Sequence, residues 1–319
     1  MSSVEFEGSM VLLEEGETVL QGLTRHGYDI PSGCQAGICQ ACVMAADEMS
    51  NVSNAQNGLS ESARTLNHFL SCQCKPDTAI RARKVSTAGT YLQGEVIAKE
   101  VFNEEVIRLR IKAALDYRPG QYVTLWKNDH TPRSYSLASH PALNDYLELH
   151  IKRMPDGKFS QWAYATLAVG DTLGVQGPLG HCFYTEKDKQ QPLLLMAIGT
   201  GLAPIYGILQ DALSQGHEGA ITLLVGARTA QDFYLVDELL ALEKANPLLS
   251  IHFVSQLDQA EFSTKGDVYA TALKLVPSLA GWRVFLCGAE SFVKKMRKQC
   301  FLVGASMSDI SADIFLPCS

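Results

Sequence analysis

Three cysteines lie close together in the segment 31–42, which reads Pro-Ser-Gly-Cys-Gln-Ala-Gly-Ile-Cys-Gln-Ala-Cys. Cys34, Cys39 and Cys42 have the spacing C-x4-C-x2-C, and Cys72 follows after 29 further residues. The chain has nine cysteines in 319 residues, an odd number and too few for a disulfide scaffold. Because thiolates are soft ligands, three of them in one short loop suit a compact metal centre, either iron–sulfur or zinc.

The rest of the cysteine pattern distinguishes an iron–sulfur cluster from a zinc site. Zinc sites usually pair two C-x2-C knuckles, whereas the second half here reads Cys72-Gln73-Cys74. The spacing resembles that of plant-type [2Fe–2S] ferredoxins, whose Leu-x-Cys ending at the fourth ligand favours Cys72 over Cys74. One departure is Gln40, where many ferredoxins have glycine. The resemblance implies a [2Fe–2S] cluster on Cys34, Cys39, Cys42 and Cys72, and a four-cysteine zinc site is the alternative.

The hydrophobic pattern changes along the chain and predicts three modules. From about 93 to 190, apolar residues alternate with polar ones, as in 107–111 and 147–151, which is typical of antiparallel strands with one solvated face. After Pro192, continuous apolar runs alternate with helix-compatible stretches such as 230–244 and 291–302, which indicates a parallel sheet covered on both faces. The apolar runs are 193–198, 221–225, 251–254 and 284–287. With a polar linker at 83–94, we predict domains at 1–85, 93–190 and 191–319.

Composition excludes several classes of protein. Hydrophobic residues make up 46% of the chain and charged residues 19%, which excludes intrinsic disorder. The net charge of −7 disfavours a nucleic-acid partner. The uncharged run 192–209 is close to membrane-spanning length, but its glycines and Pro204 favour a buried strand, a turn and a helix, so no membrane partner is expected. An acidic N-terminus without an apolar segment predicts a cytoplasmic location.

A second motif, Thr-Pro-Arg-Ser-Tyr-Ser at 131–136, follows an Arg-Pro-Gly-Gln-Tyr-Val run at 118–123. Together they resemble the flavin site of the ferredoxin–NADP reductase superfamily. The resemblance implies that Arg133 pairs with a flavin phosphate, that Tyr135 stacks on the isoalloxazine, and that Ser136 hydrogen-bonds near N5. Alone, Arg133 would be read as half of a surface ion pair.

A Gly-x-x-Ser element at 157–160 precedes a helix-compatible stretch. Backbone amides and a hydroxyl at a helix N-terminus suit a second phosphate, which favours FAD over FMN. Basic and histidine side chains of the preceding strand are expected to line the same dinucleotide. The predicted residues of this part of the FAD site are His150, Lys152, Gly157, Lys158 and Ser160.

A third motif, Gly-Thr-Gly-Leu-Ala-Pro at 199–204, follows the first continuous apolar run. A pyrophosphate would meet a helix N-terminus there, at the carboxyl end of a parallel strand. The reductase superfamily has Gly-Thr-Gly-x-Ala-Pro at this point, and its Cys-Gly beside the nicotinamide resembles residues 287–288. The resemblance implies a nicotinamide site formed by Gly199, Thr200, Gly201, Ala203, Pro204, Cys287 and Gly288.

The carboxyl end of the sequence supplies two more candidates. Asp313 and Phe315 resemble a carboxylate-x-aromatic ending that closes over the flavin in relatives, although the carboxylate there is usually glutamate. Ser136, Cys287 and Asp313 are therefore the predicted catalytic residues, and a buried structural thiol is the alternative for Cys287. Arg228 is the only base near the expected adenosine end, and Asp232 would repel a 2′-phosphate, so NADH is favoured over NADPH.

Taken together, the chain resembles the NADH-dependent reductase components of bacterial oxygenases, such as those of benzoate dioxygenase and soluble methane monooxygenase. The resemblance implies an α+β and α/β multidomain fold: a β-grasp ferredoxin domain, an antiparallel β-barrel FAD domain and a parallel-sheet nicotinamide-binding domain. It implies hydride transfer from NADH to FAD, and then single electrons through the cluster to a partner. That partner would be a terminal oxygenase of the Rieske or diiron type, or a separate electron carrier.

Two other functions stay open at this point. One is direct reduction of a small molecule, such as a deoxysugar intermediate or a metal complex, and the other is a redox-sensing module with a regulatory cluster. The residues without an expected role, interpreted as packing or surface, are His181, Cys182, Cys300 and Cys318.

Overall fold

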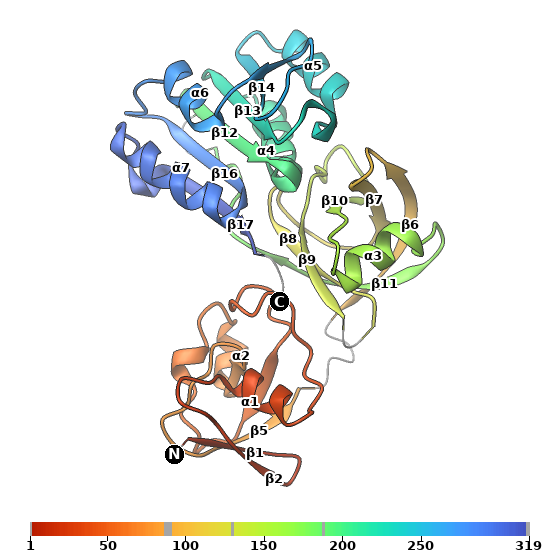
Figure 1. Cartoon of the computed structure of the whole chain (residues 1–319), viewed down its shortest axis with the longest axis vertical. Coiled ribbons are helices and arrows are strands. Elements are labelled where there is room, and N and C mark those ends of the chain that lie inside the picture. The colour runs from red at the N-terminus through yellow and green to blue at the C-terminus, as the bar shows by residue number, and fades with distance from the viewer. Residues whose placement is uncertain (1, 86–90, 129–130, 187–188, 317–319) are drawn as a thin grey trace.

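The structure is a computed structural model that describes residues 2–85, 91–128, 131–186 and 189–316. Residues 86–90 of the predicted linker and Cys318 lie outside these ranges. Three sheets follow one another along the chain, one in each of three domains (Figure 1). The predicted three-domain architecture is confirmed.

The first domain is a small mixed sheet, in which β1 and β5 are parallel and the other neighbouring strands are antiparallel. A capping box between Thr18 and Gln21 begins its main helix, α1. The cysteine loop 31–42 connects α1 to β3. The strand order is β2-β1-β5-β3-β4. Its elements are β1 (Ser3–Phe6), β2 (Ser9–Leu12), α1 (Val19–Arg25), β3 (Val43–Ala46), η1 (Ser53–Ala55), α2 (Glu61–Thr65), β4 (His68–Leu70) and β5 (Ile80–Lys84).

The second domain is a six-stranded antiparallel sheet with the order β10-β7-β6-β11-β8-β9. A bridge between Leu137, just after β9, and Leu149 in β10 joins the two edges of the sheet. Apolar side chains alternate along β7 and β10, and Leu109 and Leu149 lie in the closed interior. Its elements are β6 (Leu92–Val101), β7 (Val106–Lys112), β8 (Tyr122–Trp126), β9 (Pro132–Ser136), β10 (Leu147–Lys152), α3 (Lys158–Ala165) and β11 (Thr172–Leu179).

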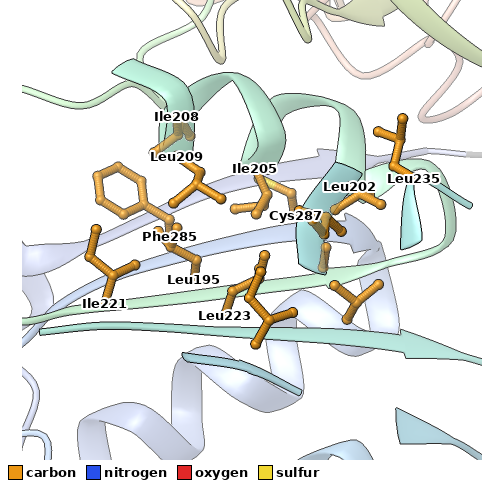
Figure 2. Close-up of a cluster of buried hydrophobic side chains, with 14 of the residues drawn as sticks. Leu195, Leu202, Ile205, Ile208, Leu209, Ile221, Leu223, Leu235, Phe285 and Cys287 are labelled. Atoms are coloured by element: carbon orange, nitrogen blue, oxygen red, sulfur yellow. The ribbon is translucent and has the colours of Figure 1, made fainter. Parts of the chain in front are cut away.

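The third domain is a parallel sheet with the order β15-β14-β13-β12-β16-β17. Figure 2 shows how helix α4 covers one face of it, with Ile205 and Leu209 packed on Leu195 and Phe285. Helices α6 and α7 cover the opposite face. Its elements are β12 (Leu193–Ile198), η2 (Gly199–Gly201), α4 (Leu202–Ser214), β13 (Ile221–Ala227), η3 (Ala230–Asp232), α5 (Val236–Ala245), β14 (Leu249–Ser255), β15 (Ser263–Lys265), α6 (Val268–Leu275), β16 (Arg283–Ala289), α7 (Glu290–Leu302), η4 (Met307–Asp309) and β17 (Ile310–Phe315).

Two sequence predictions can be compared with these elements. The run 192–209 forms a strand, a turn and a helix, and no described helix is long and apolar enough to span a membrane. The stretch 230–244 is not one helix, because α5 begins only at Val236. Asp232 closes a short capping turn on Thr229, and Leu235 has a left-handed φ of 58°, so the backbone breaks before the helix starts.

Candidate functional site

The cysteine loop folds around the sulfur of Cys34. Its Sγ accepts hydrogen bonds from the backbone amides of Ala36 (3.4 Å), Ile38 (3.3 Å) and Cys39 (3.3 Å). The amide of Cys34 in turn donates to Cys39 Sγ at 3.3 Å. Amides that point at sulfur stabilise negative charge there, which is what a bound iron–sulfur cluster needs.

The four predicted ligands form two contacting pairs, Cys34 with Cys39 and Cys42 with Cys72. A hydrogen bond from Cys39 lowers the pKa of Cys34 to about 5, and one from Cys42 lowers the pKa of Cys72 to about 7. In the described part of the chain, no three His, Cys, Asp or Glu side chains gather closely enough to hold one metal ion. Two pairs of thiols fit a two-iron cluster, with two thiolates for each iron, better than a single zinc ion.

Two neighbouring residues bear on the same loop. Cys74 is fully buried in the core of the first domain, where burial raises the pKa of its thiol to about 12. Burial alone causes this rise in pKa, so no other thiol contributes to it, although Cys42 and Cys72 lie in the same core cluster. Gln40, at the position where many ferredoxins have glycine, adopts a left-handed φ of 55°, and its side chain donates to the carbonyl of Gly58 at 2.9 Å. The departure in sequence keeps the backbone conformation that glycine favours.

Strand β9 places Arg133, Tyr135 and Ser136 along its length. Arg133 and Tyr135 are half-buried, and Ser136 is buried. The Tyr135 ring lies 5.6 Å from the Phe159 ring in the first turn of α3. The structure thereby brings the second motif beside the helix N-terminus at 157–160, as a site for one dinucleotide would require.

The predicted residues at the start of α3 differ in how exposed they are to a bound phosphate. Lys158 is exposed, and Gly157 is the N-cap of α3. Ser160 is buried, and its hydroxyl accepts from the Met154 amide at 3.0 Å and donates to the Gly157 carbonyl at 3.2 Å. Ser160 therefore shapes the loop, Phe159 is buried beside it, and Lys158 is exposed.

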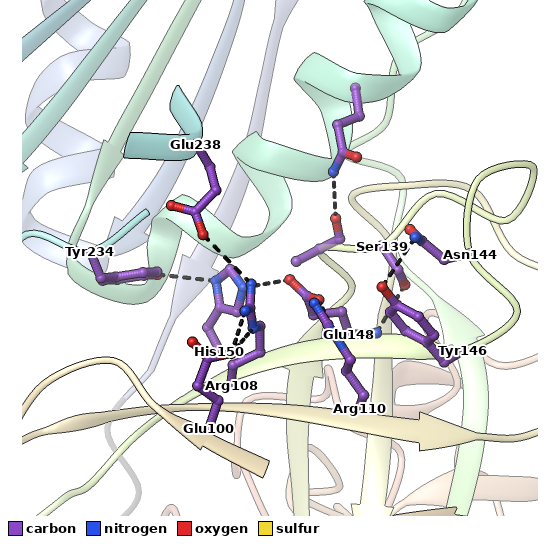
Figure 3. A network of polar contacts seen from close by, with 12 residues as sticks. Glu100, Arg108, Arg110, Ser139, Asn144, Tyr146, Glu148, His150, Tyr234 and Glu238 are labelled. Carbon is purple, nitrogen blue, oxygen red and sulfur yellow. Dashed lines mark hydrogen bonds and ion pairs between the residues drawn. The ribbon is translucent and has the colours of Figure 1, made fainter. Parts of the chain in front are cut away.

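His150 and Lys152, predicted to line FAD, both have side-chain contacts within the protein. Figure 3 shows the His150 ring between Glu148 and Tyr234, which belongs to the third domain. Its Nδ1 is 3.2 Å from the Tyr234 hydroxyl and its Nε2 is 3.2 Å from Glu148 Oε1. Lys152 pairs with Glu105 at 2.8 Å. His150 is therefore a buried residue of a domain interface, with both ring nitrogens occupied by protein.

The turn at 199–201 presents open space at the carboxyl end of β12. Gly199 has a φ of 52° and nothing within 4 Å of its Cβ position, whereas a Cβ on Gly201 would collide with the Cys287 carbonyl. Thr200 is half-buried, and Ala203 and Pro204 are buried in the first turn of α4. The backbone at Gly201 packs closely against strand β16, and the space beside Gly199 is open. Such a turn can bring backbone amides close to a phosphate of a dinucleotide.

The three predicted catalytic residues come together from two domains. The Ser136 hydroxyl donates to Asp313 Oδ2 at 2.6 Å, which joins β9 to β17. Asp313 is in register with Cys287 on the neighbouring strand β16, as Phe315 is with Ala289. Burial raises the pKa of Asp313, and the hydrogen bond from Ser136 opposes that rise. Gly288, with a φ of 142°, packs against Ile198 next to the 199–201 turn.

Arg228 and Asp232, the two residues predicted for the adenosine end, lie in the segment that follows β13. Arg228 is exposed just after β13. The Asp232 carboxylate accepts from the backbone amide of Thr229 at 2.8 Å and from its hydroxyl at 2.9 Å. Asp232 is thus held in the loop by its own neighbour and keeps a negative charge close to Arg228.

Sequence reasoning missed two features of the site. Cys182, interpreted there as packing, is buried in contact with the Cys287 thiol, and burial followed by that contact raises the pKa of Cys287. Tyr122 and Thr124 in β8 hydrogen-bond to the cysteine loop. No sequence spacing indicates that Cys182 contacts Cys287. Polar and apolar side chains alternate along 122–126, but this pattern does not show that the cysteine loop packs against the strand.

Comparison with known proteins gives a family model for each domain. Residues 4–77 match a 2Fe-2S iron-sulfur cluster binding domain, residues 93–184 an oxidoreductase FAD-binding domain, and residues 195–298 an oxidoreductase NAD-binding domain. These matches confirm a [2Fe–2S] cluster, FAD and NAD(P)H as the cofactors of the three domains.

Similar proteins cover nearly the whole chain. The reductase component of the naphthalene 1,2-dioxygenase system of Pseudomonas putida is 30% identical over 312 residues, which is 95% of this chain and 94% of that protein. The toluate 1,2-dioxygenase electron transfer component of the same species is 31% identical and covers 88% of this chain and 86% of its own length. The crystal structure of an Amycolatopsis cytochrome P450 reductase aligns over 100% of both chains with a TM-score of 0.72 and 28% identity. The chain therefore belongs to the reductase components of oxygenase systems within the ferredoxin–NADP reductase family, which carry electrons from NAD(P)H through FAD and an N-terminal [2Fe–2S] domain.

Proposed function

We propose that the chain oxidises NADH at the junction of its second and third domains and delivers the electrons singly to a protein partner. The observation that carries this proposal is the meeting of Ser136, Asp313 and Cys287 beside the open turn at 199–201. Bound there, FAD would supply a group that accepts a hydride and gives up electrons one at a time.

The protein's own residues have distinct tasks in this proposal. Arg133 would pair with a phosphate of FAD, the first turn of α3 with Lys158 would face the second phosphate, and Tyr135 would lie against the ring. The Ser136 hydroxyl donates a hydrogen bond to Asp313, and this bond holds the Ser136 oxygen in place. Because the pKa of Asp313 is raised, this carboxyl is suited to hold a proton beside the reacting atoms. Cys287 closes the apolar wall on which the nicotinamide would rest.

The choice of NADH rests on the charges around the adenosine end. A 2′-phosphate needs several positive or hydroxyl groups, and Arg228 is the only base that the sequence places there. Asp232, fixed by Thr229, adds a negative charge that would repel the phosphate of NADPH.

The acceptor is proposed to be a terminal oxygenase of the Rieske or diiron type, or a separate electron carrier. Relatives of 28–31% identity serve systems named for naphthalene, terephthalate, toluate and propane, which supports an oxygenase but singles out no substrate. A cytoplasmic location, where NADH is abundant and thiols stay reduced, belongs to the same proposal. None of the eight described cysteines is in a disulfide bond.

The test uses the purified holoprotein with each coenzyme and two acceptors, ferricyanide and cytochrome c. We expect NADH-dependent reduction of both, with kcat/KM for NADH at least about tenfold above that for NADPH, the effect of one unfavourable charge in a binding site. Ser136→Ala should slow flavin reduction by about 10- to 100-fold with little change in KM, because the hydroxyl acts at the reacting atoms. Equal use of NADPH would contradict the coenzyme assignment, and turnover unaffected by Ser136→Ala would contradict the site.

A further inference from the structure

One face of strand β8 lies directly against the cluster-binding loop. Side chains alternate across a strand, so Tyr122, Thr124 and Trp126 point to the same side of β8. The Tyr122 hydroxyl donates to the carbonyl of Ile38 at 3.1 Å, and the Thr124 hydroxyl donates to the carbonyl of Cys39 at 3.1 Å. Two backbone groups of the loop are therefore held by side chains of the flavin domain.

Trp126 completes this strip with an apolar contact. Its side chain is buried and packs against Cys39 and Ala41 of the loop. It is held in place by stacking on Tyr91, with ring centroids 6.0 Å apart, and by a 3.0 Å hydrogen bond from Nε1 to Gln176. The loop thus rests on an indole whose position is fixed from behind.

All three residues pair with β9 through the backbone, and Thr124 also forms a side-chain hydrogen bond with that strand. Thr124 is fully buried, is paired with Ser134 in the β8–β9 register, and has its Oγ1 3.1 Å from Ser134 Oγ. The single hydroxyl hydrogen of Thr124 is used in the hydrogen bond to the Cys39 carbonyl. In the hydrogen bond with Ser134, Thr124 is therefore the acceptor and Ser134 the donor. Ser134 stands between Arg133 and Tyr135, the two residues assigned to FAD.

We propose that Thr124 is a positioning residue for electron transfer: it fixes the cluster loop on the flavin strand and links Cys39 to Ser134 by hydrogen bonds. The inference rests on the proposed function, since it assumes FAD beside β9 and a cluster on Cys39. No bond would form or break in this step. One electron would pass from FAD to one iron of the cluster, and the hydride from one NADH, which carries two electrons, would supply two such transfers.

The experiment compares three variants of the holoprotein. Thr124→Val removes the hydroxyl with almost no change in shape, Thr124→Ser keeps it, and Thr172→Val is the same substitution at an exposed position in β11. Rapid mixing with NADH separates bleaching of the flavin from reduction of the cluster. Hydrogen exchange of the amides at 33–42 reports, without any turnover, how firmly the loop is docked.

We expect Thr124→Val to slow cluster reduction by about tenfold and to speed loop exchange similarly, the shift expected from losing a buried hydrogen bond. Flavin bleaching should be unchanged, Thr124→Ser should restore both values, and Thr172→Val should match the wild type. Wild-type rates and wild-type exchange in Thr124→Val would overturn the inference. If the wild type itself shows no NADH-dependent bleaching, the proposed function fails, and the exchange data still decide whether Thr124 docks the loop.

Discussion

The flavin domain meets its two neighbours in different ways. Towards the third domain it buries charged and aromatic side chains, among them Glu148 and His150 against Tyr234, as Figure 3 shows. The backbones also come close, because a Cβ on Gly207 of α4 would lie 2.9 Å from the carbonyl of Leu137. Towards the first domain it offers the narrow strip of β8, and a hollow lined by Ala41, Ala63, Trp126 and Gln176 lies beside that strip.

The difference fits the two transfers that the protein performs. A hydride moves only between atoms in contact, so the domains that hold FAD and nicotinamide must keep one geometry. An electron crosses a gap, so the cluster domain needs an aligned contact but no continuous interface. We infer that the second and third domains behave as one body and that the first is separable from them.

The largest effect should come from removing a ligand in the separable domain. We expect Cys39→Ser to lower cytochrome c reduction by at least about 100-fold, because loss of a thiolate ligand dismantles the cluster. Ferricyanide reduction and flavin bleaching by NADH should persist. Cys74→Ala is the matched control: Cys74 is buried in the same core, but burial alone raises its pKa and no thiol partner contributes, so the variant should keep the cluster spectrum. Loss of flavin bleaching in Cys39→Ser would show that the domains are not separable.

The second prediction concerns the tight interface and uses two glycines of equal backbone strain. Gly120 and Gly170 have φ values of 91° and 93°, but only a Cβ on Gly120 would collide with the Cys182 carbonyl and with Ile208 of α4. We expect Gly120→Ala to lower the free energy of unfolding by about 1–3 kcal/mol more than Gly170→Ala does, through overpacking. Urea unfolding followed by flavin release measures the difference. Equal losses would mean that α4 is not pressed against the flavin domain.

The third and smallest effect is a pH dependence of the same interface. Burial lowers the pKa of His150, with Arg108 and Arg110 also disfavouring its charge and Glu148 favouring it. Below about pH 6.5 the unfolded chain therefore binds a proton that the folded chain does not. Stability should fall as pH falls from that point, by at most about 1.4 kcal/mol per pH unit from this residue.

His150→Gln tests the assignment, because glutamine can keep a hydrogen bond but does not titrate near neutral pH. Urea midpoints between pH 8 and pH 5.5 should decline less steeply in this variant than in the wild type. Identical slopes would mean that another group causes the decline, or that His150 carries its charge in the folded protein.

Local patterns in the sequence predicted the fold well and predicted part of the site. Alternation and continuous apolar runs identified the two larger sheets, because burial on one face or both leaves a direct mark on the sequence. The cysteine spacing indicated a cluster because three of the four predicted ligands lie in one short loop, so the pattern can be seen in a local segment. Contacts between distant segments could not be predicted in this way. The contact of His150 with Tyr234 is an example, because the packing of two domains decides it.

The helix break at Leu235 and the strip of β8 show the same limit. A capping turn between Thr229 and Asp232 competes with helix formation, and composition alone does not reveal which of the two forms. The residues Tyr122, Thr124 and Trp126 look like an ordinary half-exposed strand until the cysteine loop is seen against them.

Electrons are proposed to pass in series through three sites of one chain: the nicotinamide site, FAD and the cluster. Rapid mixing of the anaerobic holoprotein with NADH, followed at flavin and cluster wavelengths, tests it most directly. We predict that flavin bleaching precedes cluster reduction and that both are complete before any partner is added. Cluster reduction without prior flavin bleaching, or a flavin that bleaches while the cluster stays oxidised, would contradict the account.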